Sequence, residues 1–141
     1  MTTEQKKLLL KDLCARLQYG VKGMSKYFAN DTLSGIIIDE EETMFNFSVN
    51  DEGFIIQLYC SEFKPYLFPL ESITEEQKKY VTDRWGINEN FNFEIDPDWG
   101  KYFVELGDVL SFIDWCYKNH LDINGLIPKG LSLDATGLNI Y

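Results

Sequence analysis

The chain has 141 residues, of which 45% are hydrophobic and 26% charged, and its formal net charge at pH 7 is −10. This length and composition are typical of one folded domain and exclude an intrinsically disordered chain. No apolar run approaches the roughly 20 residues that span a bilayer, and such an excess of acids repels nucleic acid and anionic membranes. We therefore expect direct contact with neither nucleic acid nor membrane.

The first residues do not form a secretory signal, because the apolar patch Leu8–Leu10 is followed at once by Lys11 and Asp12. We therefore expect a cytoplasmic protein. Three cysteines are widely spaced along the chain: Cys14, Cys60 and Cys116. Disulfide frameworks and zinc sites need closely spaced pairs, so this pattern predicts buried, reduced thiols and no metal centre.

The charges are unevenly distributed. No Lys or Arg occurs between Lys26 and Lys64. Eight acids accumulate in that interval: Asp31, Asp39, Glu40, Glu41, Glu42, Asp51, Glu52 and Glu62. A second acidic stretch follows: Glu89, Glu94, Asp96, Asp98, Glu105 and Asp108. Acidic surfaces of this kind either keep a protein in solution or present a charged face to a partner.

Residues 3–18 are predicted to form a helix, with Thr2 and Gln5 as a capping box and Gly20 as its stop signal. Its inward stripe is expected to consist of Leu10, Leu13, Cys14 and Leu17. Three basic residues are expected to lie off that stripe: Lys7, Lys11 and Arg16.

Strands are predicted next, over residues 21–28 and 33–39. The apolar run Ile36–Ile38 in the second of these suggests burial on both faces. Apolar and polar residues then alternate over two arms, on either side of a turn that ends in Gly53. Residues 44–60 are therefore predicted to form a β-hairpin.

Two prolines, Pro65 and Pro69, bracket an apolar stretch and predict a stiff, extended corner between a strand-rich and a helix-rich half. A helix is predicted over residues 75–85, because Thr74 and Gln77 form a second capping box at its start.

Residues 91–95 alternate between apolar and polar side chains and predict an edge strand, and residues 96–100 have the composition of a loop. Asp108 is expected to cap a third helix over residues 109–119. The tail from His120 onward is rich in Gly and is expected to be irregular.

No repeat or linker divides the sequence, so we predict one α+β domain over residues 1–141. Three helices are expected to pack on an antiparallel meander of four to five strands, which could take the form of a small curved sheet or half-barrel.

His120 is the only histidine, and imidazole is the group whose ordinary pKa suits a general base near neutral pH. Its place just past a helix is explained more simply by contact with the last carbonyls. Asp96 and Asp98 suggest the start of a calcium loop, but Gly100 comes one residue early and Glu105 falls short of the final ligand position. No nucleophile motif or glycine-rich phosphate loop occurs, so we expect no cofactor.

Aromatic residues gather beside acids in the second acidic stretch. Trp and Tyr are the side chains that most often anchor protein interfaces. We therefore predict a protein-binding face that consists of Phe91, Phe93, Asp96, Asp98, Trp99 and Tyr102. The competing interpretation assigns these rings to the core and to ordinary surface.

Three functions are compatible with the sequence. The first is a non-enzymatic cytoplasmic module that binds a protein partner through this acidic, aromatic face. The second is a small enzyme with carboxylate and histidine chemistry around Asp96, Asp98 and His120. The third is a mimic of nucleic acid that inhibits a nucleic-acid enzyme, because side chains two apart on a strand lie ~7 Å apart, as phosphates do along DNA. The oligomeric state is left open.

Three segments carry a resemblance to known proteins. They are KDLCARLQYGVKG (Lys11–Gly23), KPYLFPLESITEEQ (Lys64–Gln77) and GLIPKGLSLDA (Gly125–Ala135). Together they resemble a widespread family of small uncharacterised proteins from gut bacteria and their phages. The resemblance covers both ends and the proline corner, and it matches residues 24–60 less clearly. It implies an accessory cytoplasmic protein of phage origin, and it implies no activity and no site residues.

Overall fold

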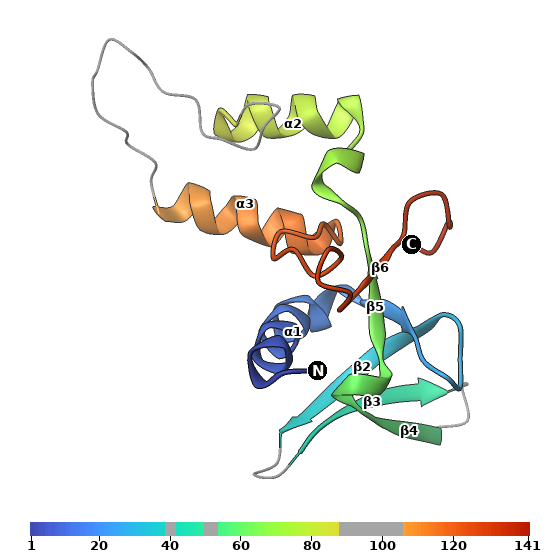
Figure 1. Cartoon of the computed structure of the whole chain (residues 1–141). Coiled ribbons are helices and arrows are strands. Elements are labelled where there is room, and N and C mark those ends of the chain that lie inside the picture. Colours follow the sequence, from blue (N-terminus) through green and yellow to red (C-terminus); the bar gives the residue numbers. More distant parts are fainter. Residues whose placement is uncertain (39–41, 50–53, 88–105) are drawn as a thin grey trace.

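The structure is a computed structural model of the whole chain, and it describes residues 1–38, 42–49, 54–87 and 106–141 (Figure 1). In chain order the elements of these residues are α1 (Thr3–Arg16), η1 (Leu17–Tyr19), β1 (Lys22–Met24), β2 (Asp31–Ile38), β3 (Thr43–Val49), β4 (Phe54–Tyr59), η2 (Cys60–Glu62), β5 (Lys64–Leu67), η3 (Leu70–Ser72), α2 (Glu75–Trp85), α3 (Leu106–Lys118) and β6 (Leu133–Asp134). The predicted α+β fold is confirmed.

The strands form one sheet in the order β4-β3-β2-β1-β5-β6. Neighbouring strands are antiparallel, except that β5 and β6 are parallel. In the described residues the sheet therefore has six strands instead of four to five, and it stays open instead of curling into a half-barrel. Two strands that were not predicted explain the larger number: β6 in the tail and β5 in the proline corner. The proline corner was predicted to be an extended connection. It pairs with β1, with Pro65 opposite Gly23, and so becomes the strand β5.

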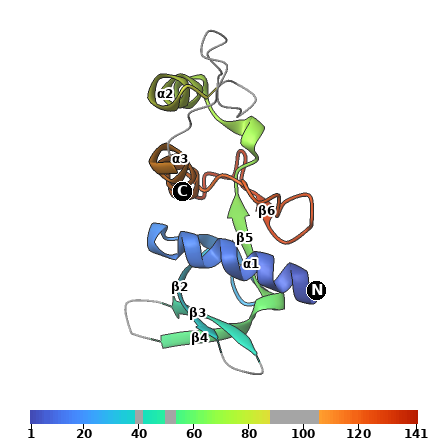
Figure 2. The ribbon, with the colours of Figure 1, turned by 90° about the vertical axis from the view of Figure 1, so that its left-hand side faces the viewer.

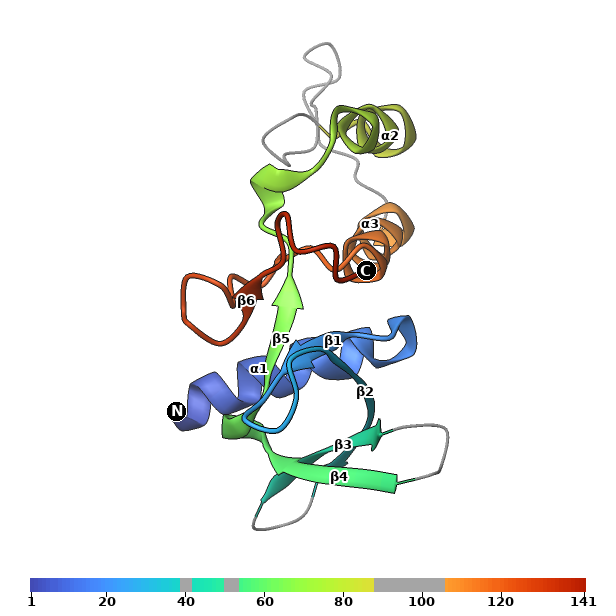
Figure 3. The ribbon, with the colours of Figure 1, turned by 90° about the vertical axis from the view of Figure 1, so that its right-hand side faces the viewer.

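α1 covers one face of the sheet (Figures 1 and 3). Its capping box of Thr2 and Gln5 is confirmed, and Gly20 in the left-handed conformation ends the 3₁₀ turn that follows. Leu9 and Leu13 of the helix are fully buried. The core cluster around them contains Val21, Leu33, Phe45, Phe47, Leu58, Cys60, Phe63 and Leu67. Each such side chain stabilises the fold by about 1.5–3 kcal/mol, so this cluster is the principal core.

The buried stripe of α1 differs from the predicted one. Cys14 is exposed, whereas Cys60 and Cys116 are buried and free as expected. Arg16 was expected off the stripe, yet it is fully buried together with Asp12. The buried face of the helix is therefore rotated about the helix axis relative to the predicted one. It can include Asp12 and Arg16 because these two charges neutralise each other.

The predicted hairpin is confirmed, since β3 and β4 pair in continuous register over their whole length. The prediction that Ile36–Ile38 is buried on both faces is wrong, because Ile37 is 37% and Ile38 65% exposed. α1 packs against only one side of this part of the sheet. No helix of the described segments lies across its other side (Figures 2 and 3).

α2 and α3 form a further layer, with α3 between α2 and α1 in both side views (Figures 2 and 3). The rings that join these two helices are Tyr80, Trp85, Phe112 and Trp115. A second, smaller core cluster lies where they meet the proline corner, and its buried members are Ile73, Cys116 and Leu121.

The boundaries of α2 match the prediction, with the capping box of Thr74 and Gln77 at its start and Gly86 in the left-handed conformation at its end. α3 begins at Leu106, so Asp108 lies in its first turn instead of capping it. The predicted strand over residues 91–95 lies outside the described residues. The tail is irregular apart from the short strand β6.

Candidate functional site

All the residues of the predicted protein-binding face lie outside the described part of the structure. All six belong to the 88–105 interval: Phe91, Phe93, Asp96, Asp98, Trp99 and Tyr102. The carboxylates proposed for an enzyme or a calcium loop lie in the same interval, so both hypotheses stay predictions. His120 is the one candidate from the sequence that the structure places.

His120 follows α3 in the left-handed conformation, at φ 56°, which is uncommon for a residue other than glycine. Its carbonyl accepts a hydrogen bond from the Phe68 N–H at 2.9 Å, so the backbone there joins α3 to the proline corner. Its ring stacks on Tyr141 with a centroid distance of 3.6 Å and an interplanar angle of 12°. The side chain is 7% exposed, and its Nδ1 atom has no hydrogen-bond partner among the described residues.

Burial, together with the positive charges of Arg16 and Lys22, lowers the pKa of His120 to about 4. The imidazole is therefore neutral near pH 7. The backbone N–H of His120 donates to the Tyr117 carbonyl at 3.0 Å, so the residue does contact the last carbonyls of α3, through its backbone and not through Nδ1. The structure also shows no described carboxylate or hydroxyl hydrogen-bonded to His120, so it supplies no general base with an orienting partner.

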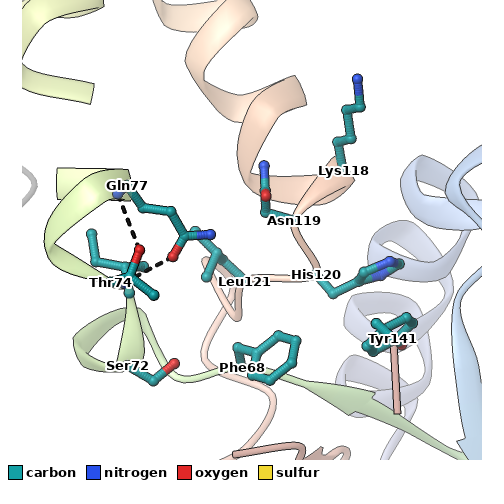
Figure 4. Close-up of a pocket in the computed structure, with 10 residues that line it drawn as sticks. Phe68, Ser72, Thr74, Gln77, Lys118, Asn119, His120, Leu121 and Tyr141 are labelled. Carbon is teal, nitrogen blue, oxygen red and sulfur yellow. Dashed lines mark hydrogen bonds between the residues drawn. The ribbon is translucent and has the colours of Figure 1, made fainter. Parts of the chain in front are cut away.

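A cavity of about 410 Å³ lies beside this histidine, between the start of α2 and the end of α3 (Figure 4). The stacked rings of His120 and Tyr141 form one wall, and Phe68 lies below the centre of the view. The side chain of Lys118 points away from the other labelled residues. The size falls within the range of small-molecule sites.

Four polar side chains of this cavity, other than those of His120 and Lys118, already form local hydrogen bonds. Thr74 and Gln77 bond to each other in the capping box, at 2.9 and 3.1 Å. The Ser72 hydroxyl donates to the Pro69 carbonyl at 2.7 Å, and the Asn119 amide donates to the Trp115 carbonyl at 2.9 Å. The cavity therefore presents capping groups and aromatic walls, and no nucleophile–base pair.

A buried polar network lies behind this cavity and was missed in the sequence. Arg16 Nε is 2.6 Å from Asp12 Oδ2, and both side chains are fully buried. Arg16 also donates to the Leu121 carbonyl at 2.6 Å, and Asn124 donates to Asp12 at 2.8 Å. The guanidinium lies over the Tyr117 ring at 4.8 Å. The spacing of Asp12 and Arg16, four residues apart on a helix, is the one signal that could have predicted the pair.

Asp122 also has a structural role. Its carboxylate accepts hydrogen bonds from the N–H groups of Leu126 and Ile127 at 2.7 and 2.8 Å, which fixes the turn after α3. Within the described ranges, no three His, Cys, Asp or Glu side chains are grouped closely enough to hold a metal ion.

The side of β2, β3 and β4 that faces away from α1 is a second candidate site. Phe45, Phe47 and Leu58 point toward α1 and are buried, so the residues that alternate with them point to the opposite side. We call that side the open face, and its side chains are Ile37, Met44, Asn46, Ile55, Gln57 and Tyr59. Cross-strand pairing places Ile37, Met44 and Tyr59 in one row over three strands.

The open face is more apolar than is usual for a surface in contact with water. Ile55 is 62% exposed and Tyr59 50% exposed. The alternation of the hairpin predicted one wet side. Gln57 is polar and exposed and fits that prediction, whereas Ile55 and Tyr59 do not, and Asn46 is only half-exposed with its Oδ1 atom buried.

The free edge of β4 adjoins the open face, because β4 is the last strand on its side of the sheet. The Tyr59 N–H donates to Glu62 at 3.1 Å, outside the ladder with β3. Backbone groups alternate in direction along an antiparallel strand, so Ile55 and Gln57 turn their N–H and C=O groups toward the same edge. A hydrogen bond from Lys26 lowers the pKa of Glu62, and the Tyr59 N–H lowers it further, which keeps this acceptor charged.

None of the described helices has the length and apolar character needed to cross a membrane. Comparison of the chain with protein-family models, with curated proteins and with solved structures gave no match. The candidate sites are therefore judged from their own geometry.

Proposed function

We propose that this chain is a non-catalytic module that binds another protein through the open face. The observation that carries this proposal is a row of partly exposed apolar side chains across three paired strands, on a side of the sheet that no described helix covers. Apolar groups gathered on one uncovered face are characteristic of interaction sites. Tyr59 adds an aromatic ring of the kind that anchors interfaces.

The charge around the open face favours a basic partner over a second copy of this chain. Residues 27–63 contain eight acids and no Lys or Arg. Of the described acids, Glu42 directly precedes β3, and Glu62 bonds to the end of β4. A second copy would place the same charges opposite each other, whereas a basic surface would be attracted and steered.

The alternatives have less support. His120 is neutral near pH 7 and stacked on Tyr141, which is unlike a general base poised to take a proton. Among the described acids, Asp31 begins β2, whereas Glu42 lies by its far end, next to β3. These positions do not form a continuous ridge like a phosphate backbone.

The proposal is tested by capture of partners from a lysate of the native cells, with Ile55→Asp compared with the unaltered chain. A charge buried in the contact surface costs binding free energy. A protein that binds through the open face is therefore expected to be captured by the unaltered chain and not by Ile55→Asp. Reciprocal capture with the purified partner then measures the Kd directly.

Leu138→Asp is the matched control, because Leu138 is 51% exposed and lies in the tail, which contacts β1 and β5 instead of the three strands of the open face. Binding is expected to survive this change. Trp99→Ala tests the face predicted from the sequence. Partner loss with Trp99→Ala and retention with Ile55→Asp would contradict the proposal and transfer the binding site to the acidic, aromatic stretch.

A further inference from the structure

We infer that the partner supplies an extended segment that pairs with β4 as a seventh strand of the sheet, and that this segment alternates apolar residues with Lys or Arg. This inference rests on the proposed function and specifies how the open face is used. It adds backbone pairing at the edge of β4 to the apolar contact made by the face.

The backbone of β4 is available for pairing. Ile55 and Gln57 turn their N–H and C=O groups away from β3, and no described residue outside the ladder bonds to them. The Tyr59 N–H is already satisfied by Glu62, so the free edge ends there. Two residues with outward groups offer up to about four main-chain hydrogen bonds, the interaction used in strand addition.

β4 also lacks the features that protect edge strands from pairing. Natural edges are blocked by Lys, by Pro, by a bulge or by a covering element. The β4 sequence, Phe-Ile-Ile-Gln-Leu-Tyr, contains neither Lys nor Pro, and its register with β3 is unbroken. The bulge of this sheet lies in β2 instead, between Leu33 and Gly35. The strand at the opposite edge, β6, has only two residues and offers little length for pairing.

The side chains of β4 define the chemistry of the incoming strand. An added strand continues the row of Ile37, Met44 and Tyr59, so its residues on that side are apolar. Glu42 is exposed and directly precedes β3, two residues before Met44 of the row, where it attracts a basic residue of the added strand; Glu62, beyond the end of β4, is already paired with Lys26. A second copy pairing through its own β4 would bring a strand that contains no basic residue.

The test uses a synthetic peptide of about ten alternating Val and Lys residues, long enough to cover one strand. Its counterpart, with Glu in place of Lys, is the charge control. Hydrogen exchange of the full chain is followed by NMR with each peptide. The Val–Lys peptide is expected to slow exchange at the Ile55 and Gln57 amides and to leave the ladder amides of Ile56 and Leu58 unchanged. Equal protection by the Val–Glu peptide overturns the charge requirement.

Gln57→Pro removes the outward N–H while leaving the ladder with β3 intact, because Pro is tolerated at the free side of an edge strand. Gln57→Pro loses one main-chain hydrogen bond and adds a ring at the edge, so it is expected to raise the Kd of the Val–Lys peptide by about tenfold or more. Gln57→Ala keeps the N–H and is expected to bind like the unaltered chain. Slow exchange at Phe45 verifies that both variants are folded. Equal binding by both variants overturns strand addition.

Two further outcomes separate this inference from the proposed function. If neither peptide binds while Ile55→Asp still abolishes partner capture, strand addition is wrong and the open face remains the contact surface. Sedimentation velocity of the chain alone tests the second-copy alternative. A dimer whose formation protects Ile55 and Gln57 would show that a second copy occupies β4, and it would overturn the inference of a basic partner strand.

Discussion

Asp12 and Arg16 lie one turn apart on α1 and are both fully buried. A buried ion pair contributes little net stability, because removing two charges from water costs about as much as their attraction returns. The additional hydrogen bonds to Leu121 and Asn124 give these two charges partners from a segment more than 100 residues away in the sequence. The pair thus connects α1 to the turn after α3.

Asp12→Ala is expected to lower the free energy of unfolding by about 3–5 kcal/mol, because it leaves the guanidinium of Arg16 buried without its counter-charge. Urea unfolding measures the loss. The double variant Asp12→Leu, Arg16→Met removes both charges and is expected to be less destabilised than Asp12→Ala. A loss below about 1 kcal/mol in Asp12→Ala would show that the pair is not buried as described.

His120 makes the stability of the fold depend on pH. Its pKa in the folded chain is about 4, below the value of 6.5 for the free side chain. Between these two pH values the unfolded chain binds the proton and the folded chain does not. The contribution of His120 is therefore complete above pH 6.5 and falls as the pH decreases toward 4, by about 3 kcal/mol in total.

As the only histidine, His120 gives a single Cε1–H resonance in the NMR spectrum, and this resonance is expected to titrate near pH 4. His120→Asn keeps a residue that tolerates the left-handed conformation. The free energy of unfolding is measured for the unaltered chain and for His120→Asn between pH 4 and 6.5. The difference between them separates the contribution of His120 from that of the carboxylates that titrate in the same pH range. Titration near pH 6.5, or an equal pH dependence of both chains, would contradict the burial of the ring.

At the scale of elements, β1 and β5 depend on one glycine. A Cβ atom added to Gly23 would lie 2.2 Å from two ring atoms of Phe63 and 2.5 Å from the Lys64 carbonyl oxygen. Such distances are shorter than any van der Waals contact, and one neighbour is backbone. The close approach lets β5 pair with β1, and so lets the proline corner enter the sheet.

Gly23→Ala is therefore expected to destabilise the chain by about 1–3 kcal/mol or more, as overpacking does in a tight core. Gly107→Ala is the control, since nothing lies within 4 Å of its added Cβ in α3. Alanine is the better helix former, so this change is expected to be neutral or slightly stabilising. Thermal unfolding compares the two variants. Equal melting temperatures would show that β1 and β5 are less closely packed than described.

At the scale of the whole molecule, the buried apolar side chains form two clusters of unequal size. The larger one lies between α1 and the sheet, and the smaller one lies between the proline corner and the end of α3. One helix cannot cover both sides of a sheet, so the side of β2, β3 and β4 away from α1 stays open. The proposed binding surface is thus a consequence of the layer arrangement.

The elements that the sequence predicted correctly are those specified by neighbouring residues. The capping boxes of Thr2 and Thr74, the stop at Gly20 and the β3–β4 hairpin each depend on residues a few positions apart. Capping hydrogen bonds and side-chain periodicity involve only residues close together in the chain, so they can be recognised in one sequence.

The misassigned features each depend on a distant partner. Arg16 was placed on the surface because its bond to Leu121, 105 residues away, has no local signal. Pro65 was placed in a connection because its pairing with Gly23 depends on the route of the chain. Ile37 was placed in the core because an apolar run alone does not show how many layers cover a strand.

Composition and short spacing were enough to predict the α+β class, the starts of α1 and α2, the hairpin and the acidic residues that flank β4 in the chain. Only the tertiary structure decided that His120 is buried against Tyr141, that Asp12 and Arg16 neutralise each other inside the fold, and that β4 lies at an edge. These properties depend on which segments pack together, because burial and strand order arise from contacts between residues far apart in the chain.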